Sequence, residues 1–273
     1  MRVTLLAVLM LVLLATHAAT AGMNLAWNNC YPSPGASADK SFICDDSSPG
    51  AGDANSQTFL LYASVVPGID INDVIGLEGD LYVMVANPTL DDWWRLGAGE
   101  CRNPIPADPS RSAIHFDVNG FTNATTCDET LMPASSNPAT ADHWFSFLGG
   151  SPNRAKYSFL AARQTGVNVS ANVEYQLARI SIESWWTKFT NAGDPAGDHA
   201  CAGCLDPACL VLHRVSLDVP VAEHPPDGKY EYIDQFNDRG WVTWQGGAVP
   251  AGGCPAATPT ARRTWGEVRS LYR

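Results

Sequence analysis

The sequence predicts an all-β fold, an antiparallel β-sandwich with long disulfide-tied loops and a short C-terminal helix. Apolar and polar residues alternate in several runs, which is the period of a half-buried strand. The segments between these runs are rich in Gly, Pro, Asn, Asp and Ser, which favour turns. Because no alternating long helices are indicated, we expect seven to nine strands that pair antiparallel.

Three runs show the alternation clearly. Run 74–85 has an apolar face that consists of Leu77, Leu81, Val83 and Val85. Run 113–118 places Ile114, Phe116 and Val118 inward. Run 209–219 has an expected inward set of Val211, Val215, Leu217 and Val219. Each is predicted to be a strand with one face in the core.

Three more runs, 57–66, 156–163 and 173–183, are strand-like because of their β-branched and aromatic residues. The last run changes phase near Ala178 and Arg179, which predicts a β-bulge. Pro- and Gly-rich segments between the runs are expected to be loops, among them 132–142.

The N-terminus is typical of a secretory signal peptide over residues 1–21. It has basic Arg2, an apolar run too short to span a bilayer, and small residues before a cleavage point after Ala21. The mature chain is therefore expected to begin at Gly22 and to be secreted or held at the cell surface. No membrane insertion is expected after cleavage.

Residues 22–222 are expected to form the β-sandwich domain, and 223–273 a C-terminal extension that packs on it. Thr264 and Glu267 have the spacing of a capping box, which predicts a short helix near 265–272. Without the signal peptide the chain has 16 basic residues (17 minus Arg2) and 28 acidic ones, a formal charge of −12. This acidic surface argues against nucleic acid as a partner.

Eight cysteines in an exported chain predict four disulfides. Sequence proximity favours Cys30 with Cys44 and Cys101 with Cys127. The other four would then pair among themselves, with one bridge inside the stretch CAGCLDPAC and one reaching the tail; these are Cys201, Cys204, Cys209 and Cys254.

The stretch CAGCLDPAC allows two further interpretations. Zinc would take Cys201 and Cys204 with Cys209 and His199, but the second CxxC of a strong zinc pattern is absent. Redox catalysis by Cys201 and Cys204 would need a CxxC at the start of a helix, whereas this one lies in a Gly/Asp/Pro loop. A structural crosslink is the preferred interpretation.

Adjacent tryptophans suggest a ligand-binding platform. In an alternating strand one member of each pair faces outward, so exposed rings are expected among Trp93, Trp94, Trp185 and Trp186. Exposed aromatic rings mark binding surfaces, including those for carbohydrate.

No cofactor or catalytic residue is expected, because the chain contains no HExxH, HxxEH or GxSxG motif. His213 is expected to be a core histidine, and His115 and His143 lie next to or near acidic residues without forming a known motif. Two acidic loops have the oxygen ligands that structural calcium would use, at Asp45, Asp46 and Asp53 and at Asp70, Asn72 and Asp73.

Two resemblances add to these expectations. The core is similar to cohesin-like and immunoglobulin-like bacterial sandwiches in the order of four stretches, LEGDLYVMVANPTL, KYSFLAARQTGVNVS, NVEYQLARISIES and CLVLHRVSLDVP. This resemblance implies a jelly-roll or immunoglobulin-like architecture, from which the insertion 101–127 departs. The chain also resembles a group of exported bacterial proteins of unknown function in CAGC, PACLVL, WVTWQGG, CPAATPT and the tail TWGEVRSLYR.

These observations favour a non-enzymatic, exported binding or structural protein that acts in adhesion, surface assembly or ligand binding. Its expected partner is an extracellular protein or glycan. One alternative is a carbohydrate-binding module that uses the four tryptophans. The other is thiol–disulfide exchange at Cys201 and Cys204.

Overall fold

The computed structural model of the chain describes the residues to which all structural statements here refer. They are 21–31, 33–45, 57–103, 113–117, 127, 129–131, 138–148, 151–187, 200–233 and 239–245.

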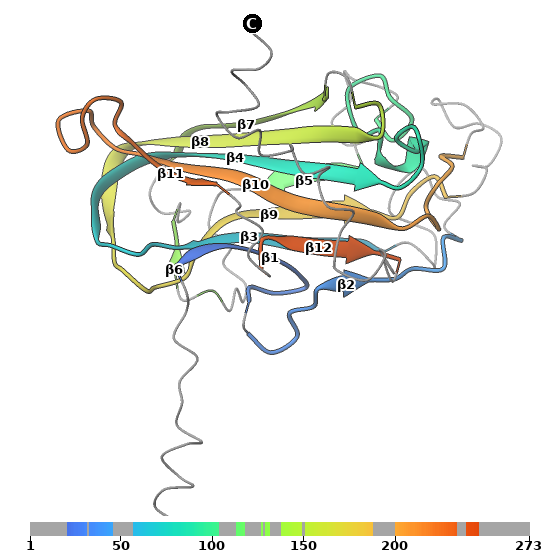
Figure 1. Cartoon of the computed structure of the whole chain (residues 1–273), viewed down its shortest axis with the longest axis horizontal. Helices are drawn as coiled ribbons and strands as arrows, with labels where there is room; N and C mark the ends of the chain where they lie inside the picture. The colour runs from blue at the N-terminus through green and yellow to red at the C-terminus, as the bar shows by residue number, and fades with distance from the viewer. Residues whose placement is uncertain are drawn as a thin grey trace, which may run out of the picture.

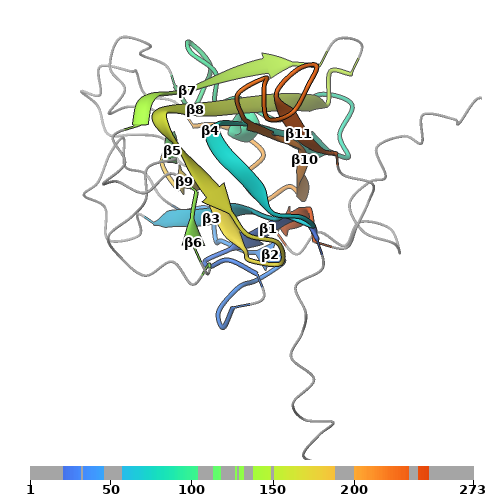
Figure 2. The same ribbon diagram turned by 90° about the vertical axis from the view of Figure 1, so that its left-hand side faces the viewer.

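Two β-sheets lie one over the other (Figures 1 and 2). Sheet A has five strands, in the order β1 (Gly22–Trp27), β3 (Thr58–Val66), β9 (Tyr175–Glu183) and β5 (Ile114–Asp117), with β6 (Glu129–Thr130) beside β9. Sheet B has seven, in the order β2 (Asp39–Lys40), β12 (Trp241–Trp244), β10 (Ala208–Asp218), β4 (Ile71–Val85), β8 (Arg154–Val169) and β7 (Pro138–Phe147), with β11 (Lys229–Ile233) beside β10.

The prediction of an all-β class is confirmed, since the described residues contain strands, a single 3-10 turn η1 (Asp92–Trp94) and no α-helix. Most strand pairs are antiparallel, and the short β2 and β6 pair parallel to their neighbours. Within the described residues no helix is long and apolar enough to cross a membrane. The helix predicted near 265–272 lies outside them.

One hydrophobic core lies between the sheets and draws on both. The apolar face predicted for run 74–85 is confirmed, because all four of its residues are buried; they are Leu77, Leu81, Val83 and Val85. Asp80, on the opposite face of β4, is also buried, under the long polar side chains of its neighbours.

The predicted inward set of β10 is partly wrong. Leu210 and Leu212 are fully buried in place of Val211, whereas Val215 and Leu217 point inward as expected. The cause is a register shift against β4 between Leu212 and Arg214, which adds one residue and reverses the alternation.

The β-bulge predicted in run 173–183 is confirmed within one residue. Ala63 of β3 pairs with Ala178, and the next residue, Ser64, pairs with Gln176. Leu177 is the additional residue, and it allows Tyr175 and Ile180 both to reach the core.

The expected boundary at residue 222 falls inside sheet B. Strands β11 and β12 both follow it and both pair with β10. The described part of the segment after residue 222 therefore completes the sheet.

Candidate functional site: an aromatic groove beside a disulfide-tied loop

The predicted disulfide pairs are wrong, although all seven described cysteines are in disulfides as expected. The structure pairs Cys30 with Cys127, Cys44 with Cys204, and Cys101 with Cys201. Cys209 is also disulfide-bonded, and its partner lies outside the described residues. Sequence proximity failed because the sheets bring together segments that are 97 to 160 residues apart.

The stretch CAGCLDPAC contains no internal bridge among its three cysteines. Cys201 is bonded to Cys101 in the loop after η1, and Cys204 is bonded to Cys44 in the segment after β2. Both are buried and bonded to distant cysteines, so they do not form the exchanging pair that CxxC redox chemistry uses. The described residues hold no group of three His, Cys, Asp or Glu side chains placed to bind a metal.

Backbone hydrogen bonds fix this stretch further. The amide of Cys201 donates to the carbonyl of Trp186 at 2.8 Å, and the amide of Trp93 donates to the carbonyl of Ala202 at 2.8 Å. Gly203, with φ of +97°, packs against Asp91 so closely that an added Cβ would lie 2.2 Å from the Cβ of Asp91. The stretch thus anchors η1 and the loop that follows it.

The four tryptophans expected to form an exposed platform are all buried. Trp93, Trp94 and Trp186 are 0% exposed, and Trp185 is 7% exposed. The strand alternation on which their exposure depended does not apply, because one pair lies in the turn η1 and the other follows the end of β9. Trp93 and Trp94 both pack on Trp244, with ring centroids 5.7 Å away.

Exposed aromatic rings occur instead on β7, where the sequence interpretation placed a loop over 132–142. Trp144 is 46% exposed and Phe147 is 47% exposed. β7 pairs with β8 at one edge of sheet B (Figure 1), and Pro138 is tolerated because it begins an edge strand. The alternating aromatic residues of HWFSF, residues 143–147, were the signal that could have identified this strand.

A groove of about 470 Å³ runs beside these rings. One wall comes from the loop after η1 and includes Leu96, Gly97, Glu100 and Asn103. The other wall comes from the strands and includes Trp144, Phe145, Phe147 and Tyr157. We call it the aromatic groove. The Cys101–Cys201 bridge fixes the loop wall, and pairing of β7 with β8 fixes the strand wall.

The rings of the groove support one another. Phe145 lies 4.9 Å from Phe147 and 5.1 Å from Tyr157, centroid to centroid. Tyr157 donates a hydrogen bond from its hydroxyl to the carbonyl of Trp94 at 2.6 Å. Burial raises the pKa of Tyr157 well above its usual range, so its hydroxyl stays protonated and remains a donor.

The polar side of the groove carries one ion pair. Nη2 of Arg95 lies 2.5 Å from Oε2 of Glu100. The Arg95 guanidinium also lies 5.9 Å from the centroid of the Phe147 ring. Glu100 is the one carboxylate among the described residues that line the groove. Its charge is therefore neutralised in place, next to an exposed ring.

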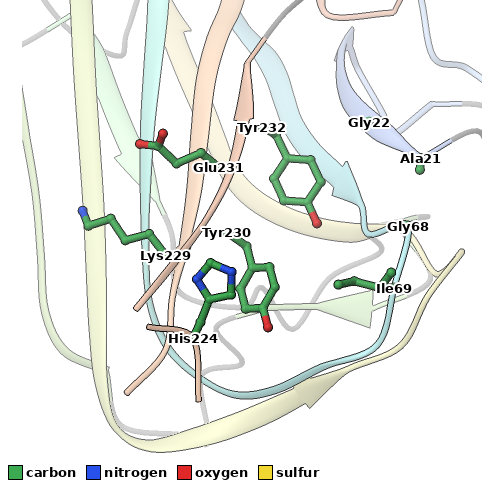
Figure 3. Close-up of a pocket in the computed structure, with 9 residues that line it drawn as sticks. All are labelled: Ala21, Gly22, Gly68, Ile69, His224, Lys229, Tyr230, Glu231 and Tyr232. Carbon is green, nitrogen blue, oxygen red and sulfur yellow. The ribbon is translucent and has the colours of Figure 1, made fainter. Parts of the chain in front are cut away.

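A second groove, of about 500 Å³, lies where β11 faces the start of β1. Figure 3 shows Tyr230 and Tyr232 pointing into it, whereas Lys229 and Glu231 point to the other side of β11. Burial and then the proximity of Tyr230 raise the pKa of Tyr232. Ala21 lines this groove, and that residue is expected to be removed with the signal peptide. The aromatic groove, whose walls are tied on both sides, is the stronger candidate.

Arg214 is the centre of an ion network on the outer face of sheet B. Its guanidinium contacts Asp80 at 3.2 Å, Glu78 at 3.3 Å and Glu231 at 3.4 Å. Ser158 donates its hydroxyl to Asp80 at 2.6 Å. These charges are mutually satisfied, so the network joins β4, β8, β10 and β11.

The remaining candidates from the sequence are spread over the molecule. His213 is not the core histidine that was expected, because it is half-buried and stacks on Tyr82 with ring centroids 4.4 Å apart. His115 lies on β5, as does Asp117 of the Asp117–Arg179 ion pair. The side chain of His143 lies outside the described residues.

The suggested calcium loops do not assemble a set of ligands within the described residues. Asp70 accepts a hydrogen bond from the amide of Ala171 at 2.7 Å, and Asn168 accepts one from the amide of Asp73 at 3.1 Å. Asp46 and Asp53 lie outside the described part of the chain.

No family model, no curated protein and no solved structure matches this chain.

Proposed function

We propose that this protein is an exported, non-enzymatic β-sandwich that binds a saccharide in the aromatic groove. The observation that carries the proposal is the pair of exposed rings, Trp144 and Phe147, on a strand whose facing wall is tied by a disulfide. A soluble protein gains no stability from exposing rings of this size, and such exposure marks a contact surface.

The chemistry of the groove suits a sugar ring. A pyranose has an apolar face of C–H groups that packs on an aromatic ring, and an edge of hydroxyl groups that form hydrogen bonds. Trp144 and Phe147 supply the first kind of contact, and Glu100 and Asn103 are side chains of the second kind. A site with aromatic walls and few polar groups is typical of small-ligand binding.

Rigidity supports binding as well. A ligand that meets preformed walls does not bear the entropic cost of ordering them. The Cys101–Cys201 bridge and the Cys201 amide bond to Trp186 hold the loop wall from two sides. The strand wall is part of a sheet, which positions side chains more accurately than a free loop.

The proposed lack of catalysis rests on the same geometry. Most glycoside hydrolases need two carboxyl groups across the scissile bond. Among the described groove residues Glu100 is the one carboxylate, and it is paired with Arg95. An arrangement of this kind binds without cleaving.

Export supports an extracellular glycan as the ligand. Three disulfides indicate an oxidising, extracytoplasmic environment. The signal-like N-terminus agrees with it. Adhesion to a polysaccharide surface, or assembly on one, would be the setting in which such binding acts.

The test is binding of the mature protein to a glycan array, followed by titration of the best glycan. Trp144→Ala and Phe147→Ala should each weaken binding about tenfold or more, since 1.4 kcal/mol of lost contact has that effect. Ile233→Ala is the matched control, because Ile233 is an exposed apolar residue outside the groove. Equal affinity in all four proteins, or no glycan bound by the wild type, would exclude the proposal.

A further inference from the structure

The described disulfide Cys30–Cys127 interleaves along the chain with each of the other two, and Cys101–Cys201 lies inside the loop that Cys44–Cys204 closes. Cysteines 30, 44, 101, 127, 201 and 204 occur in that order, and no bridge joins two neighbours in it. Cys44 and Cys101 both lie between Cys30 and its partner Cys127, and their own partners lie beyond Cys127, at Cys204 and Cys201. A chain that is exported from its N-terminus presents each early cysteine before its partner.

Local pairing is strongly favoured while the chain is unfolded. Cys30 and Cys44 are 14 residues apart, whereas Cys30 and Cys127 are 97 apart. Since the chance of loop closure falls as about the −3/2 power of loop length, the local pair forms roughly 20 times more readily. By the same relation Cys101 meets Cys127 roughly eight times more readily than Cys201, over 26 residues rather than 100.

We infer that this chain is a substrate of a thiol–disulfide isomerase and reaches its native bridges by exchange. A disulfide oxidant first takes up two electrons and two protons for each bridge, becoming a dithiol, and makes Cys30–Cys44. The isomerase thiolate then attacks the sulfur of Cys30, a mixed disulfide forms, and Cys44 leaves as a thiolate. A second isomerase thiolate opens Cys101–Cys127 in the same way, by attack on the sulfur of Cys101, and Cys127 leaves as a thiolate. The Cys127 thiolate then attacks the sulfur of Cys30 and displaces the first isomerase, which leaves as the thiolate that entered. The exchange steps consume no oxidant.

Burial explains why exchange stops at the native set. Both ends of Cys30–Cys127 are buried, and the half-buried Cys44 and Cys101 are each bonded to a buried cysteine, Cys204 and Cys201. Exchange needs a thiolate to reach a sulfur along the line of the disulfide, so a buried bridge reacts slowly. A misplaced Cys30–Cys44 bridge would keep Cys30 away from Cys127 and the core incomplete, so its sulfurs would stay accessible.

The inference is independent of the aromatic groove and is tested on the mature chain by peptide mapping under non-reducing conditions. The reduced, unfolded protein is oxidised with diamide alone, or with a glutathione buffer and protein disulfide isomerase. Random pairing of eight cysteines gives the native set in about 1% of molecules. Diamide should give mainly Cys30–Cys44 and Cys101–Cys127, and the isomerase should convert these to the native bridges with a yield many times higher. Native bridges in high yield with diamide alone would overturn it.

A cellular test uses secretion in a bacterial host with and without its periplasmic isomerase. When the isomerase is absent, the amount of wild-type protein with native bridges should be several times lower. The control is a variant in which Cys30, Cys44, Cys127, Cys204, Cys209 and Cys254 are all changed to Ser, so that Cys101 and Cys201 can pair only with each other. Peptide mapping detects the Cys101–Cys201 bridge whether or not this variant folds. The bridge should form to the same extent in both hosts. Equal yield of native wild type in both hosts would refute the inference.

Discussion

The guanidinium of Arg102 stacks on the indole of Trp93, with its central carbon 3.4 Å from the ring centroid. Both side chains are 0% exposed. Arg102 also donates a hydrogen bond to the carbonyl of Glu183, at the end of β9. A buried positive charge is tolerated here because the ring face and the carbonyl oxygen both carry negative potential. The pair therefore joins the loop wall of the aromatic groove to sheet A.

The Arg102→Ala variant should be strongly destabilised. It loses a desolvated cation–π contact and a charged hydrogen bond, which together contribute about 3 kcal/mol or more to the free energy of unfolding. Urea unfolding followed by tryptophan fluorescence measures this change. Arg95→Ala removes partly exposed ion pairs and a long contact with the exposed Phe147 ring, and it should cost less than about 1 kcal/mol. Equal losses in the two variants would mean that the Arg102–Trp93 stack contributes no special stability.

Sequence reasoning could identify strands but not the position of this pair. Alternation in run 74–85 predicted four core residues correctly, since a strand with one buried face has a fixed period. Trp93 was placed on the same rule, and the rule failed because residues 92–94 form a 3-10 turn. A short turn has no period of two, so the sequence around it does not show which ring points inward.

Replacing Gly203 by Ala should disrupt the CAGC loop. The residue has a φ of +97°, where L-residues are strained, and its added Cβ would lie 2.2 Å from the Cβ of Asp91. Since Asp91 directly precedes η1, the clash would displace Trp93 and the loop wall. The expected loss of unfolding free energy is about 3 kcal/mol, the sum of backbone strain and overpacking.

Gly35→Ala is a matched control for this variant. Gly35 has nearly the same φ, +92°, but an added Cβ there meets no atom within 4 Å. Its cost should be the backbone strain alone, about 1 kcal/mol. If thermal unfolding shows the same loss for both variants, the contact with Asp91 is not significant.

Asp91 should make stability fall as pH rises through the acidic range. Burial raises the pKa of this carboxyl above its ordinary value of 3.8, with smaller contributions from Asp206 and Asp92, against the hydrogen bond from Asn87. Its Oδ2 is buried with no hydrogen-bond partner among the described residues. The folded state therefore binds the proton more tightly than the unfolded state. Between the pKa of Asp91 in the unfolded state and its higher pKa in the folded state, stability decreases as the pH rises. Above both pKa values, the full cost of burying the charged carboxylate remains.

The Asp91→Asn variant should remove this cost. It should be more stable than the wild type at pH 7, and the difference should vanish at acidic pH, where Asp91 of the wild type is protonated. Urea unfolding across that range measures it. A wild-type advantage at pH 7 that is lost on acidification would contradict the assignment, because it would require a lowered pKa.

The disulfides show a second limit of sequence reasoning. The even count and the signal-like N-terminus predicted that the cysteines would be bonded. Partners depend on which strands become neighbours, and β3, β9 and β10 bring together residues 97 to 160 positions apart. Likewise, Trp144 was overlooked because the Pro- and Ser-rich segment before it favours a loop, while pairing with β8 makes it an edge strand.

Gly97 determines the shape of the aromatic groove. An added Cβ there would lie 2.4 Å from the ring of Phe145, which in turn packs on Phe147 and Tyr157. Gly97 lines the groove, yet a methyl group at this position acts mainly by displacing the ring. Gly99, two residues on in the same loop, meets nothing within 4 Å.

Gly97→Ala should therefore weaken saccharide binding while the protein stays folded. Displacing the Phe145 ring moves the Phe147 stacking surface, and a loss of about 1 kcal/mol corresponds to about fivefold in affinity. Calorimetric titration with the best glycan from the array measures the affinity, and circular dichroism verifies the fold. Gly99→Ala should bind as the wild type does, although its φ of +80° makes it slightly less stable. A Gly97→Ala protein that binds with unchanged affinity would show that the ligand does not rest on the Phe145–Phe147 pair, and the strand wall would then have to act through Trp144 alone.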